Sequence, residues 1–300
     1  MSAVDAGTPW ARGRLDERGG PARVLFGRMY EDTAIEAGAF AADARVFCIA
    51  SAGCTAIALA PGRSVVAVDV NPVQLAYAAR RLRGEPAVHG LVERGMSGAR
   101  AAAVMAGWRP AALAEFLAMD NPVAQTAVWR ERLDTRRFRL GFDSLMSLAA
   151  LRAVYADKLL SFLPPHLGAV LRGRLARGFA LHPNCRNPYA QALFAGALPQ
   201  GEPPPAADNV QLVHADAAAF LEGAAAGSFD AFSLSNILDG AATGYRQRLF
   251  AAVRHAAAPG AQVVVRSFAE PPASRTSNRA ADDRAMLWGI VDVRPAETLE

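Results

Sequence analysis

The chain has 300 residues, of which 52% are hydrophobic and 20% charged, and its formal net charge is +4. This length accommodates one large domain or two modest ones with a substantial core, and the composition is that of a soluble α/β protein. The three cysteines form no C-x-x-C pair, which argues against a disulfide framework or a structural zinc site, so we expect no bound metal.

The basic excess lies in the middle of the chain. Residues 84–208 contain 14 Arg plus Lys and 10 Asp plus Glu, which accounts for the whole net charge of +4. This bias is too small to indicate nucleic-acid binding, but it is compatible with an anionic lipid surface or substrate. No apolar run reaches the roughly 18 residues of a membrane span, and acidic residues interrupt the N-terminus where a signal peptide would be apolar. The cytoplasm is therefore the default compartment.

The N-terminal part begins with residues 1–22, whose Gly, Pro, Arg and Asp content predicts a loose arm. The segment from residue 25 to residue 40 places apolar side chains among charged ones and predicts a helical lead-in to the first strand. Within it, Tyr30, Glu31 and Asp32 put an aromatic ring and two carboxylates just before that strand. These three residues are either a solvated helix start or groups that hold the amino group of a cofactor.

The segment Val46–Gln74 carries the strongest functional signal. Two β-branched runs, residues 46–50 and 65–70, flank a turn and a short helical pattern, which predicts a strand–turn–helix–strand unit. The turn consists of Ser51, Ala52, Gly53 and Cys54, whose small side chains let backbone N–H groups approach a ligand at a helix N-terminus. Asp69 ends the second run, where a carboxylate accepts hydrogen bonds from ribose hydroxyls. A nucleoside-containing cofactor is the first hypothesis, and the single glycine disfavours a dinucleotide clamp.

The third predicted strand lies far along the chain from the second. A helix pattern follows Asn71 and Pro72, yet the next strand pattern begins only near residue 209. We therefore predict a Rossmann-like domain in two parts, residues 23–83 and 209–300. A large, mainly helical insertion, residues 84–208, separates them between the second and third strands.

Two helices are predicted inside this insertion. Periodic apolar residues from Leu145 to Phe162 predict one long helix, capped by Asp143 or Ser144. The second, Leu167–Phe179, sets three arginines against leucines, which is typical either of a membrane-surface helix or of an ordinary domain surface.

A Pro-punctuated loop follows these helices. It contains His182, Asn187 and Tyr189, placed for contact rather than for a core. Residues 199–205 are rich in proline and predict the exit linker.

Polar residues follow each later strand pattern. The predicted strands are residues 210–215, 229–234, 262–265 and 287–293. Asp216, Asn236 and Arg266 come directly after or within two residues of three of them. Because the carboxyl ends of parallel strands meet at one ligand-binding edge, we expect these residues to lie there with Asp69.

Several motifs together resemble a known family. They are LFGRMYED, SAGCTA followed by VDVNPVQLAY, the NPY loop, SFDAFSLSNILDG, VVVRSF and DRAMLWG. Over about residues 24–295 the chain resembles the BtaA-type S-adenosylmethionine:diacylglycerol 3-amino-3-carboxypropyltransferases of betaine-lipid synthesis. The resemblance implies S-adenosylmethionine as co-substrate, diacylglycerol or a similar lipid as acceptor, and peripheral attachment to the inner face of the membrane. It also implies a separate N-methyltransferase that completes the lipid.

The resemblance also implies roles for individual residues. Arg266 would grip the carboxylate of the methionine chain, and Glu31 or Asp32 would take its ammonium group. The implied cofactor site comprises Tyr30, Glu31, Asp32, Ser51, Ala52, Gly53, Cys54, Asp69, Val70, Asn71, Gln74, Asp216, Ala217, Ser235, Asn236 and Arg266. The acceptor hydroxyl needs a base, for which His182, Tyr189 and Asp239 are candidates. We favour Tyr189 and His182, because the insertion should supply the acceptor side.

Other functions remain open at this point. The same cofactor unit serves a methyltransferase, or an aminocarboxypropyltransferase with a soluble acceptor, because the position of the nucleophile selects the carbon that reacts. A non-catalytic protein that binds lipid or S-adenosylmethionine is the third alternative.

Overall fold

A computed structural model of the 300-residue chain describes residues 14, 20–153, 155–196, 207–272 and 278–300, without the side chains of residues 158 and 159. The predicted arm, residues 1–22, lies mostly outside these ranges, and the predicted linker, residues 199–205, lies wholly outside them.

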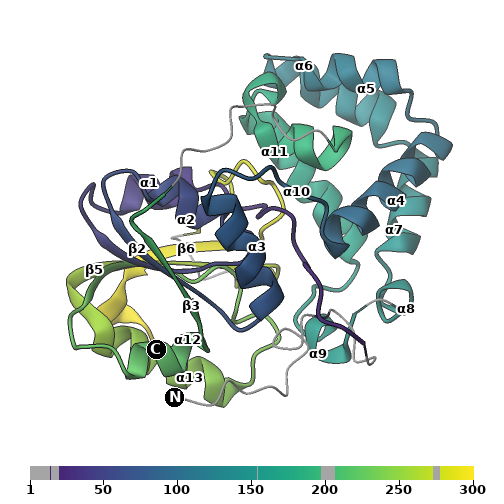
Figure 1. The fold of residues 1–300 in the computed structure, drawn as a ribbon. Coiled ribbons are helices and arrows are strands. Elements are labelled where there is room, and N and C mark those ends of the chain that lie inside the picture. The colour runs from purple at the N-terminus through teal and green to yellow at the C-terminus, as the bar shows by residue number, and fades with distance from the viewer. Residues whose placement is uncertain (1–13, 15–19, 154, 197–206, 273–277) are drawn as a thin grey trace.

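A six-stranded sheet forms the centre of the molecule, in the order β3-β2-β1-β4-β5-β6 (Figure 1). Strands β1 to β5 run parallel and β6 runs antiparallel to β5. The strands are β1 (Arg45–Ile49), β2 (Ser64–Asp69), β3 (Val210–His214), β4 (Phe229–Ser233), β5 (Ala257–Ser267) and β6 (Ile290–Pro295). The predicted α/β fold is confirmed, and this mostly parallel sheet is compatible with a Rossmann-like domain.

Helices cover both faces of the sheet. They are α1 (Ala34–Ala39), α2 (Cys54–Leu59), α3 (Pro72–Leu82), α12 (Ala217–Glu222) and α13 (Thr243–Ala256), with a 3-10 turn η4 (Ala296–Thr298) near the C-terminus. One core cluster joins the sheet to α1 and α2, and another joins it to α12 and α13. Figure 1 shows these two helical layers on opposite sides of the strands. The β-branched runs of β1 and β2 are buried because both faces are covered.

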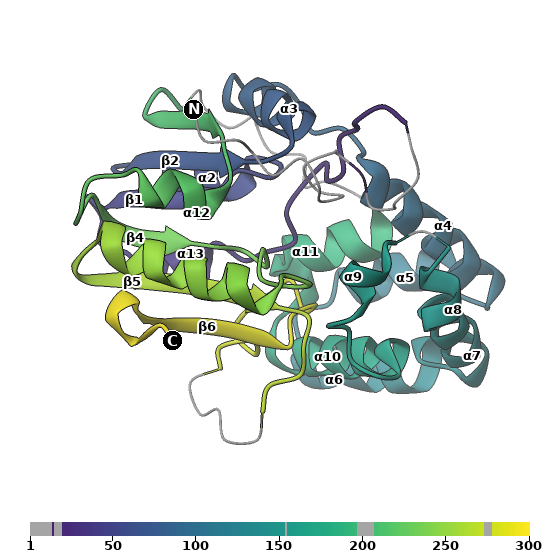
Figure 2. The same cartoon turned by 90° about the horizontal axis from the view of Figure 1, so that it is seen from below.

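A second group of helices lies between α3 and β3 in the sequence. Its α-helices are α4 (Leu91–Met105), α5 (Pro110–Leu117), α6 (Pro122–Val128), α7 (Arg136–Leu145), α8 (Leu148–Leu151), α9 (Asp157–Leu160), α10 (Leu167–Leu181) and α11 (Pro188–Ala190). The π-helical turns η1 (Trp129–Leu133) and η3 (Gln191–Ala195) and the 3-10 turn η2 (Asn184–Arg186) join them. They surround an aromatic cluster that includes Trp108, Trp129 and Phe179. Figures 1 and 2 both show this group beside the sheet.

The long helix predicted from Leu145 to Phe162 is wrong. The structure has the end of α7 and two short helices, α8 and α9, instead. Ser147 has extended backbone angles and its hydroxyl accepts the N–H of Ala150, so it caps a new helix. Ala156 is also extended, and it precedes α9. The apolar spacing was helical, but these two residues interrupt the hydrogen-bond ladder.

The helix α10 confirms the prediction for Leu167–Phe179, but two of its arginines face inward. Arg174 is buried and donates to the carbonyls of Leu287 at 2.7 Å and Phe268 at 2.8 Å. Arg172 pairs with Asp143, its Nη2 lying 2.8 Å from Oδ2. Two of the three arginines of α10 therefore support the fold, and Arg177 is exposed.

Other boundaries differ from the predictions by a few residues. Helix is confined to Ala34–Ala39 in the N-terminal lead-in, because residues 25 and 26 bind the side chain of Gln74 in a non-helical conformation. Helix α13 ends at Ala256, and β5 already begins at Ala257. Within the described residues, no helix is long and apolar enough to cross a membrane.

Candidate functional site

The carboxyl ends of the parallel strands bring together most of the predicted site. The turn after β1, Asp69 at the end of β2, Ser235 after β4 and Arg266 in β5 all lie at this edge. The strand order reverses direction between β1 and β4, and such a switch point is where open α/β sheets bind ligands.

Asp69 fastens the end of β2 to the turn after β1. Its Oδ2 accepts the N–H of Ser51 at 3.0 Å, and its Oδ1 accepts the N–H of Asn71 at 2.8 Å. Ser51 and Gly53 have positive φ angles of 42° and 81°, which form the tight turn. Burial raises the pKa of Asp69 to about 6. Each carboxylate oxygen retains a lone pair for a further donor such as a ribose hydroxyl.

The other turn residues leave little side chain above this edge. Ala52 is fully buried, and Cys54 is half-buried with its Sγ 3.4 Å from the N–H of Met29. Val70 follows Asp69, and its carbonyl contacts His214 Nε2 at 3.0 Å. The turn therefore offers mainly its backbone to a ligand.

Glu31 is a buried residue of the predicted site with unused hydrogen-bonding capacity. Its side chain is 5% exposed, and its Oε1 accepts a hydrogen bond from the Ser235 hydroxyl. Its Oε2 has no hydrogen-bond partner in the described part of the chain and lies 3.7 Å from Arg266 Nη1. Burial raises the pKa of Glu31 to about 7, against the opposing charge of Arg266. A buried carboxylate oxygen without a partner is costly, and a cationic ligand would satisfy it.

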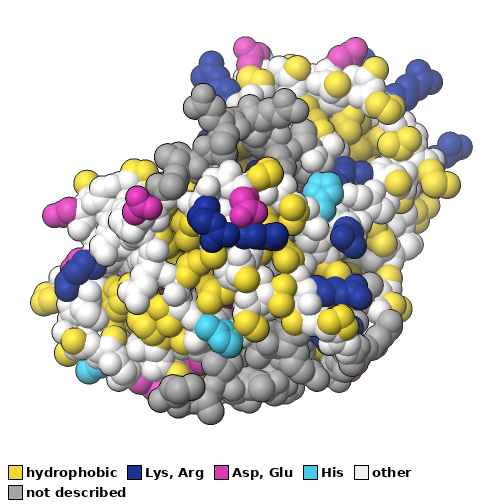
Figure 3. Space-filling view, in the orientation of Figure 1, with side chains coloured by type: hydrophobic (Ala, Val, Ile, Leu, Met, Phe, Trp, Pro, Cys, Tyr) yellow, Lys and Arg dark blue, Asp and Glu magenta, His cyan; other side chains and the backbone are white. Residues whose placement is uncertain are grey.

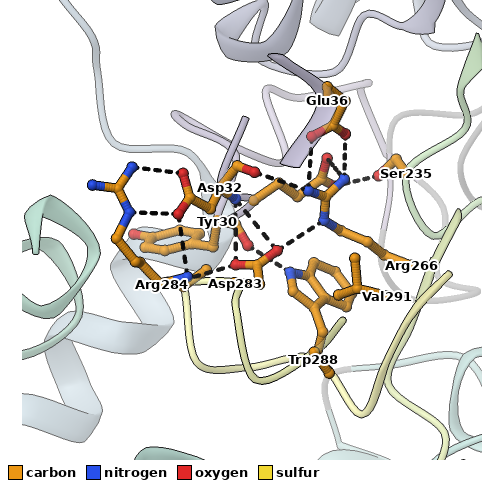
Figure 4. Close-up of polar contacts among 12 residues, drawn as sticks. Tyr30, Asp32, Glu36, Ser235, Arg266, Asp283, Arg284, Trp288 and Val291 are labelled. Carbon is orange, nitrogen blue, oxygen red and sulfur yellow. Dashed lines mark hydrogen bonds and ion pairs between the residues drawn. The ribbon is translucent and has the colours of Figure 1, made fainter. Parts of the chain in front are cut away.

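The role predicted for Arg266 does not match its surroundings (Figure 4). Its side chain has no exposed surface and binds Glu36 through both terminal nitrogens. Its Nε donates to Asp283 at 3.0 Å and its Nη2 donates to the Asp32 carbonyl at 3.1 Å. With four of its five N–H groups donated within the protein and no exposed surface, Arg266 is a structural residue and cannot grip a ligand carboxylate in this arrangement.

Asp32 is also occupied, contrary to its predicted role. Arg284 holds both of its carboxylate oxygens in a bidentate pair, with Nη2 2.7 Å from Oδ1. Burial opposes ionisation, but the hydrogen bonds and charge of Arg284 keep the pKa of Asp32 below its ordinary value. Of the two predicted ammonium acceptors, Glu31 alone has a free oxygen.

Asn71 and Gln74 support the chain instead of facing a ligand. Asn71 caps α3 by accepting the N–H groups of Val73 and Gln74. The Gln74 side chain is buried, accepts the N–H of Leu25 at 2.9 Å and donates to the Phe26 carbonyl at 2.8 Å. These two side chains hold residues 23–26 against α3, and a cofactor role for Asn71 and Gln74 stays a prediction.

Asp216 and its neighbour Ala217 begin α12. The Oδ1 of Asp216 caps the helix by accepting the Ala219 N–H at 2.9 Å, and its Oδ2 accepts the Tyr245 hydroxyl at 2.8 Å. Ala217 is buried in the core. Asp216 has lone pairs left, but its present partners explain its position without a ligand.

The loop after β4 is tied to the end of β5 by Asp239. Its Oδ1 accepts the Ser267 hydroxyl, and its Oδ2 accepts the N–H of Phe268 at 3.0 Å and the amide of Asn236 at 3.2 Å. Burial raises the pKa of this carboxyl. Ser235 has a positive φ of 52°, which is strained for a residue other than glycine. Its hydroxyl donates a hydrogen bond to Glu31 Oε1.

Tyr189 and His182 contact different parts of the chain. The Tyr189 hydroxyl donates to the Glu31 carbonyl at 2.5 Å, and burial raises its pKa. His182 ends α10, and its Nε2 lies 2.9 Å from the Ala281 carbonyl. No hydrogen bond joins the two side chains within the described ranges, so the structure connects Tyr189 with Glu31 and leaves His182 apart.

The sequence patterns did not single out three residues of the candidate site: Glu36, Asp283 and Arg284. They complete the buried charge network around Arg266 and Asp32 (Figure 4). Glu36 sits in the apolar context AIEAGAF, and the other two precede AMLWG. Glu36 lies inside an apolar stretch, which is a signal that could have identified it. Asp283 and Arg284 lie in a charged segment, so the sequence pattern alone does not indicate their pairing.

Comparisons with protein-family models, curated proteins and solved structures give no match for this chain. Within the described residues, no group of three or more His, Cys, Asp or Glu side chains is placed to hold a metal ion.

Proposed function

We propose that the chain binds S-adenosylmethionine across the carboxyl edge of the sheet and transfers its 3-amino-3-carboxypropyl group to the hydroxyl of diacylglycerol. The supporting observation is one pair of carboxyl groups at that edge. Asp69 closes the turn after β1, and Glu31, bound by Ser235 after β4, is buried with one oxygen that has no hydrogen-bond partner among the described residues. The Asp69 carboxylate suits the hydroxyls of a ribose, and the Glu31 carboxylate suits a cation.

The charge balance around Glu31 supports a cationic ligand. When Glu31 is ionised, above its pKa of about 7, the charge network contains four carboxylates and two guanidinium groups, namely Glu31, Asp32, Glu36, Asp283, Arg266 and Arg284. A surplus of buried negative charge is costly unless a positive group compensates it. The ammonium of the methionine chain and the nearby sulfonium would supply positive charge here.

S-adenosylmethionine offers three electrophilic carbons next to its sulfonium, so the position of the acceptor decides the reaction. For the acceptor hydroxyl, Asp239 is the best of the three predicted bases. It is a buried carboxyl at the ligand edge with a raised pKa, whereas burial makes Tyr189 harder to ionise. Tyr189 would instead position the Glu31 backbone, and His182 contacts Ala281.

The helices between α3 and β3 would form the acceptor side, as an insertion into the Rossmann-like domain. Their surface exposes Val104, Met105, Leu140, Leu145 and Leu148 together with Arg136, Arg137 and Arg139. Figure 3 shows hydrophobic and basic side chains interspersed over the side of the molecule where α4 and α7 lie. Such a mixed surface suits the anionic inner face of a membrane. We propose peripheral attachment of a cytoplasmic protein there, with N-methylation left to a separate enzyme.

The nucleoside product tests this function. The protein is incubated with S-adenosylmethionine and diacylglycerol vesicles, and the nucleosides are separated by chromatography. Methylthioadenosine that requires diacylglycerol supports the proposal. S-adenosylhomocysteine indicates a methyltransferase, methylthioadenosine formed equally without lipid indicates a soluble acceptor, and binding without turnover indicates a non-catalytic protein.

A further inference from the structure

A small cavity lies between residues 27–30, the start of α4 and η3. Arg28, Tyr30, His89, Glu93 and Arg100 contribute to its lining. The cavity is close to the turn after β1, since Met29, which lies within residues 27–30, has its backbone N–H 3.4 Å from the Cys54 Sγ.

The cavity carries an excess of positive charge. The Glu93 carboxylate already accepts the backbone N–H groups of Gly27, Arg28 and Gly90. Arg100 donates to the Leu193 carbonyl at 3.2 Å and to Ser97 at 2.8 Å, which leaves further N–H groups of its guanidinium unused.

Arg28 has capacity as well. The Arg28 residue is half-buried, and its guanidinium has no hydrogen-bond or ion-pair partner in the described part of the chain. Two guanidinium groups therefore face one carboxylate, and the surplus is one positive charge. Burial lowers the pKa of Arg100, which is the expected effect of a cation that lacks a carboxylate bound directly to it.

We propose that this cavity is an oxyanion site, in which Arg28, Arg100 and the Tyr30 hydroxyl hold the carboxylate of the aminocarboxypropyl chain. The ligand identity rests on the proposed function. Arg266 cannot take this carboxylate in this arrangement, because its side chain is fully buried and four of its five N–H groups donate within the protein. Guanidinium groups with unused donors are the side chains best suited to the task.

Calorimetric binding of two nucleosides tests the site. S-adenosylmethionine carries the carboxylate and decarboxylated S-adenosylmethionine lacks it. The parent protein should bind the first at least about tenfold more tightly, since a hydrogen bond to a charged group contributes roughly 1.5–3 kcal/mol. Arg28→Met and Arg100→Met should each lower the affinity for S-adenosylmethionine about 10- to 100-fold, and the affinity for decarboxylated S-adenosylmethionine less than about threefold.

Arg94→Met is the matched control, because Arg94 is exposed on the same helix as Arg100 and is not among the lining residues. It should change neither affinity. Equal binding of both nucleosides to the parent, or equal weakening of both by Arg100→Met, overturns the proposal. Circular dichroism confirms that each variant is folded.

Failure of the proposed function can be distinguished from failure of the oxyanion site. If the parent binds neither nucleoside, that function fails. Thermal stabilisation by inorganic phosphate, lost in Arg28→Met and Arg100→Met but kept in Arg94→Met, then still supports an oxyanion site, whereas no stabilisation of the parent overturns it. Arg100→Lys should recover part of the affinity because it keeps the charge.

Discussion

The Asp69 carboxylate accepts the backbone N–H of Ser51 at 3.0 Å, which joins the end of β2 to the turn after β1. One side chain therefore shapes the turn and, in the proposed function, would also bind the ribose. A change at Asp69 should affect both the local backbone and the ligand.

Asp69→Asn should lower the affinity for S-adenosylmethionine by about tenfold or more, because the amide cannot accept at both positions and loses the charge-assisted hydrogen bonds. Isothermal titration calorimetry measures the affinity. Asp230→Asn is the control, since Asp230 pairs with Arg45 at the other end of the sheet. Unchanged affinity in Asp69→Asn would remove the cofactor assignment.

Ligand binding should depend on pH through Glu31, whose pKa burial raises to about 7. Below that pH the carboxyl is protonated and cannot attract an ammonium, so affinity for S-adenosylmethionine should rise about tenfold from pH 6 to pH 8. Glu31→Gln should bind weakly and lose most of this rise. Glu222→Gln, at an exposed ion pair with Arg248, should keep it. An unaltered pH profile in Glu31→Gln contradicts the assignment.

The ligand-free protein should respond to pH in the opposite sense. In the unfolded chain Glu31 ionises near its ordinary pKa of 4.5, whereas in the folded protein it keeps its proton until about pH 7. The unfolded state therefore loses its proton first, and the free energy of unfolding should fall as pH rises from about 4.5 to 7. Urea unfolding of the parent and of Glu31→Gln measures the Glu31 contribution, which the variant should lack.

Arg266→Met should destabilise the fold by about 3–5 kcal/mol, because it leaves Glu36 and Asp283 buried without their cation. Arg248→Met removes an exposed pair and should cost no more than about 1 kcal/mol. Urea denaturation gives both values. A loss in Arg266→Met as small as in the control would show that the network contributes little.

Turnover should depend on Asp239 more than on Tyr189. Asp239→Asn should reduce kcat about 100-fold or more while the affinity for S-adenosylmethionine changes less than about threefold, as expected of a general base. Tyr189→Phe should retain more than about a tenth of kcat, since the hydroxyl only donates to the Glu31 carbonyl. The reverse order of effects would identify Tyr189 as the base.

Vesicle binding should depend on α7. Arg136→Glu with Arg137→Glu, and separately Leu140→Asp, should each reduce sedimentation with anionic vesicles at least about fivefold, because the first reverses the charge and the second removes apolar contact. Leu140 is 70% exposed, so its replacement should leave the fold intact. Leu181→Asp is the control at another exposed leucine. Binding to nucleic acid instead of vesicles would contradict a membrane surface.

The sequence identified the strands more accurately than the partners of each side chain. The runs around Val46 and Val65 are buried strands as predicted, since a parallel sheet covered on both faces needs continuous apolar segments. The positions of Asp69 and Ser235 followed from the strand ends.

What could not be predicted depends on contacts between distant parts of the chain. Arg266 was expected to face a ligand, but Glu36, 230 residues away, occupies it. The periodicity after Leu145 was helical, but local caps divided the segment. Side-chain pairing across such separations is set by the packed fold, so a pattern along the chain identifies a charged residue but not its partner.

The most direct measurement uses S-adenosylmethionine labelled with ¹³C in its aminocarboxypropyl chain, incubated with the protein and diacylglycerol vesicles. Mass spectrometry should find the label in an ether-linked diacylglycerylhomoserine, formed in equal amount with unlabelled methylthioadenosine. A lipid without label, accompanied by labelled S-adenosylhomocysteine, would contradict aminocarboxypropyl transfer.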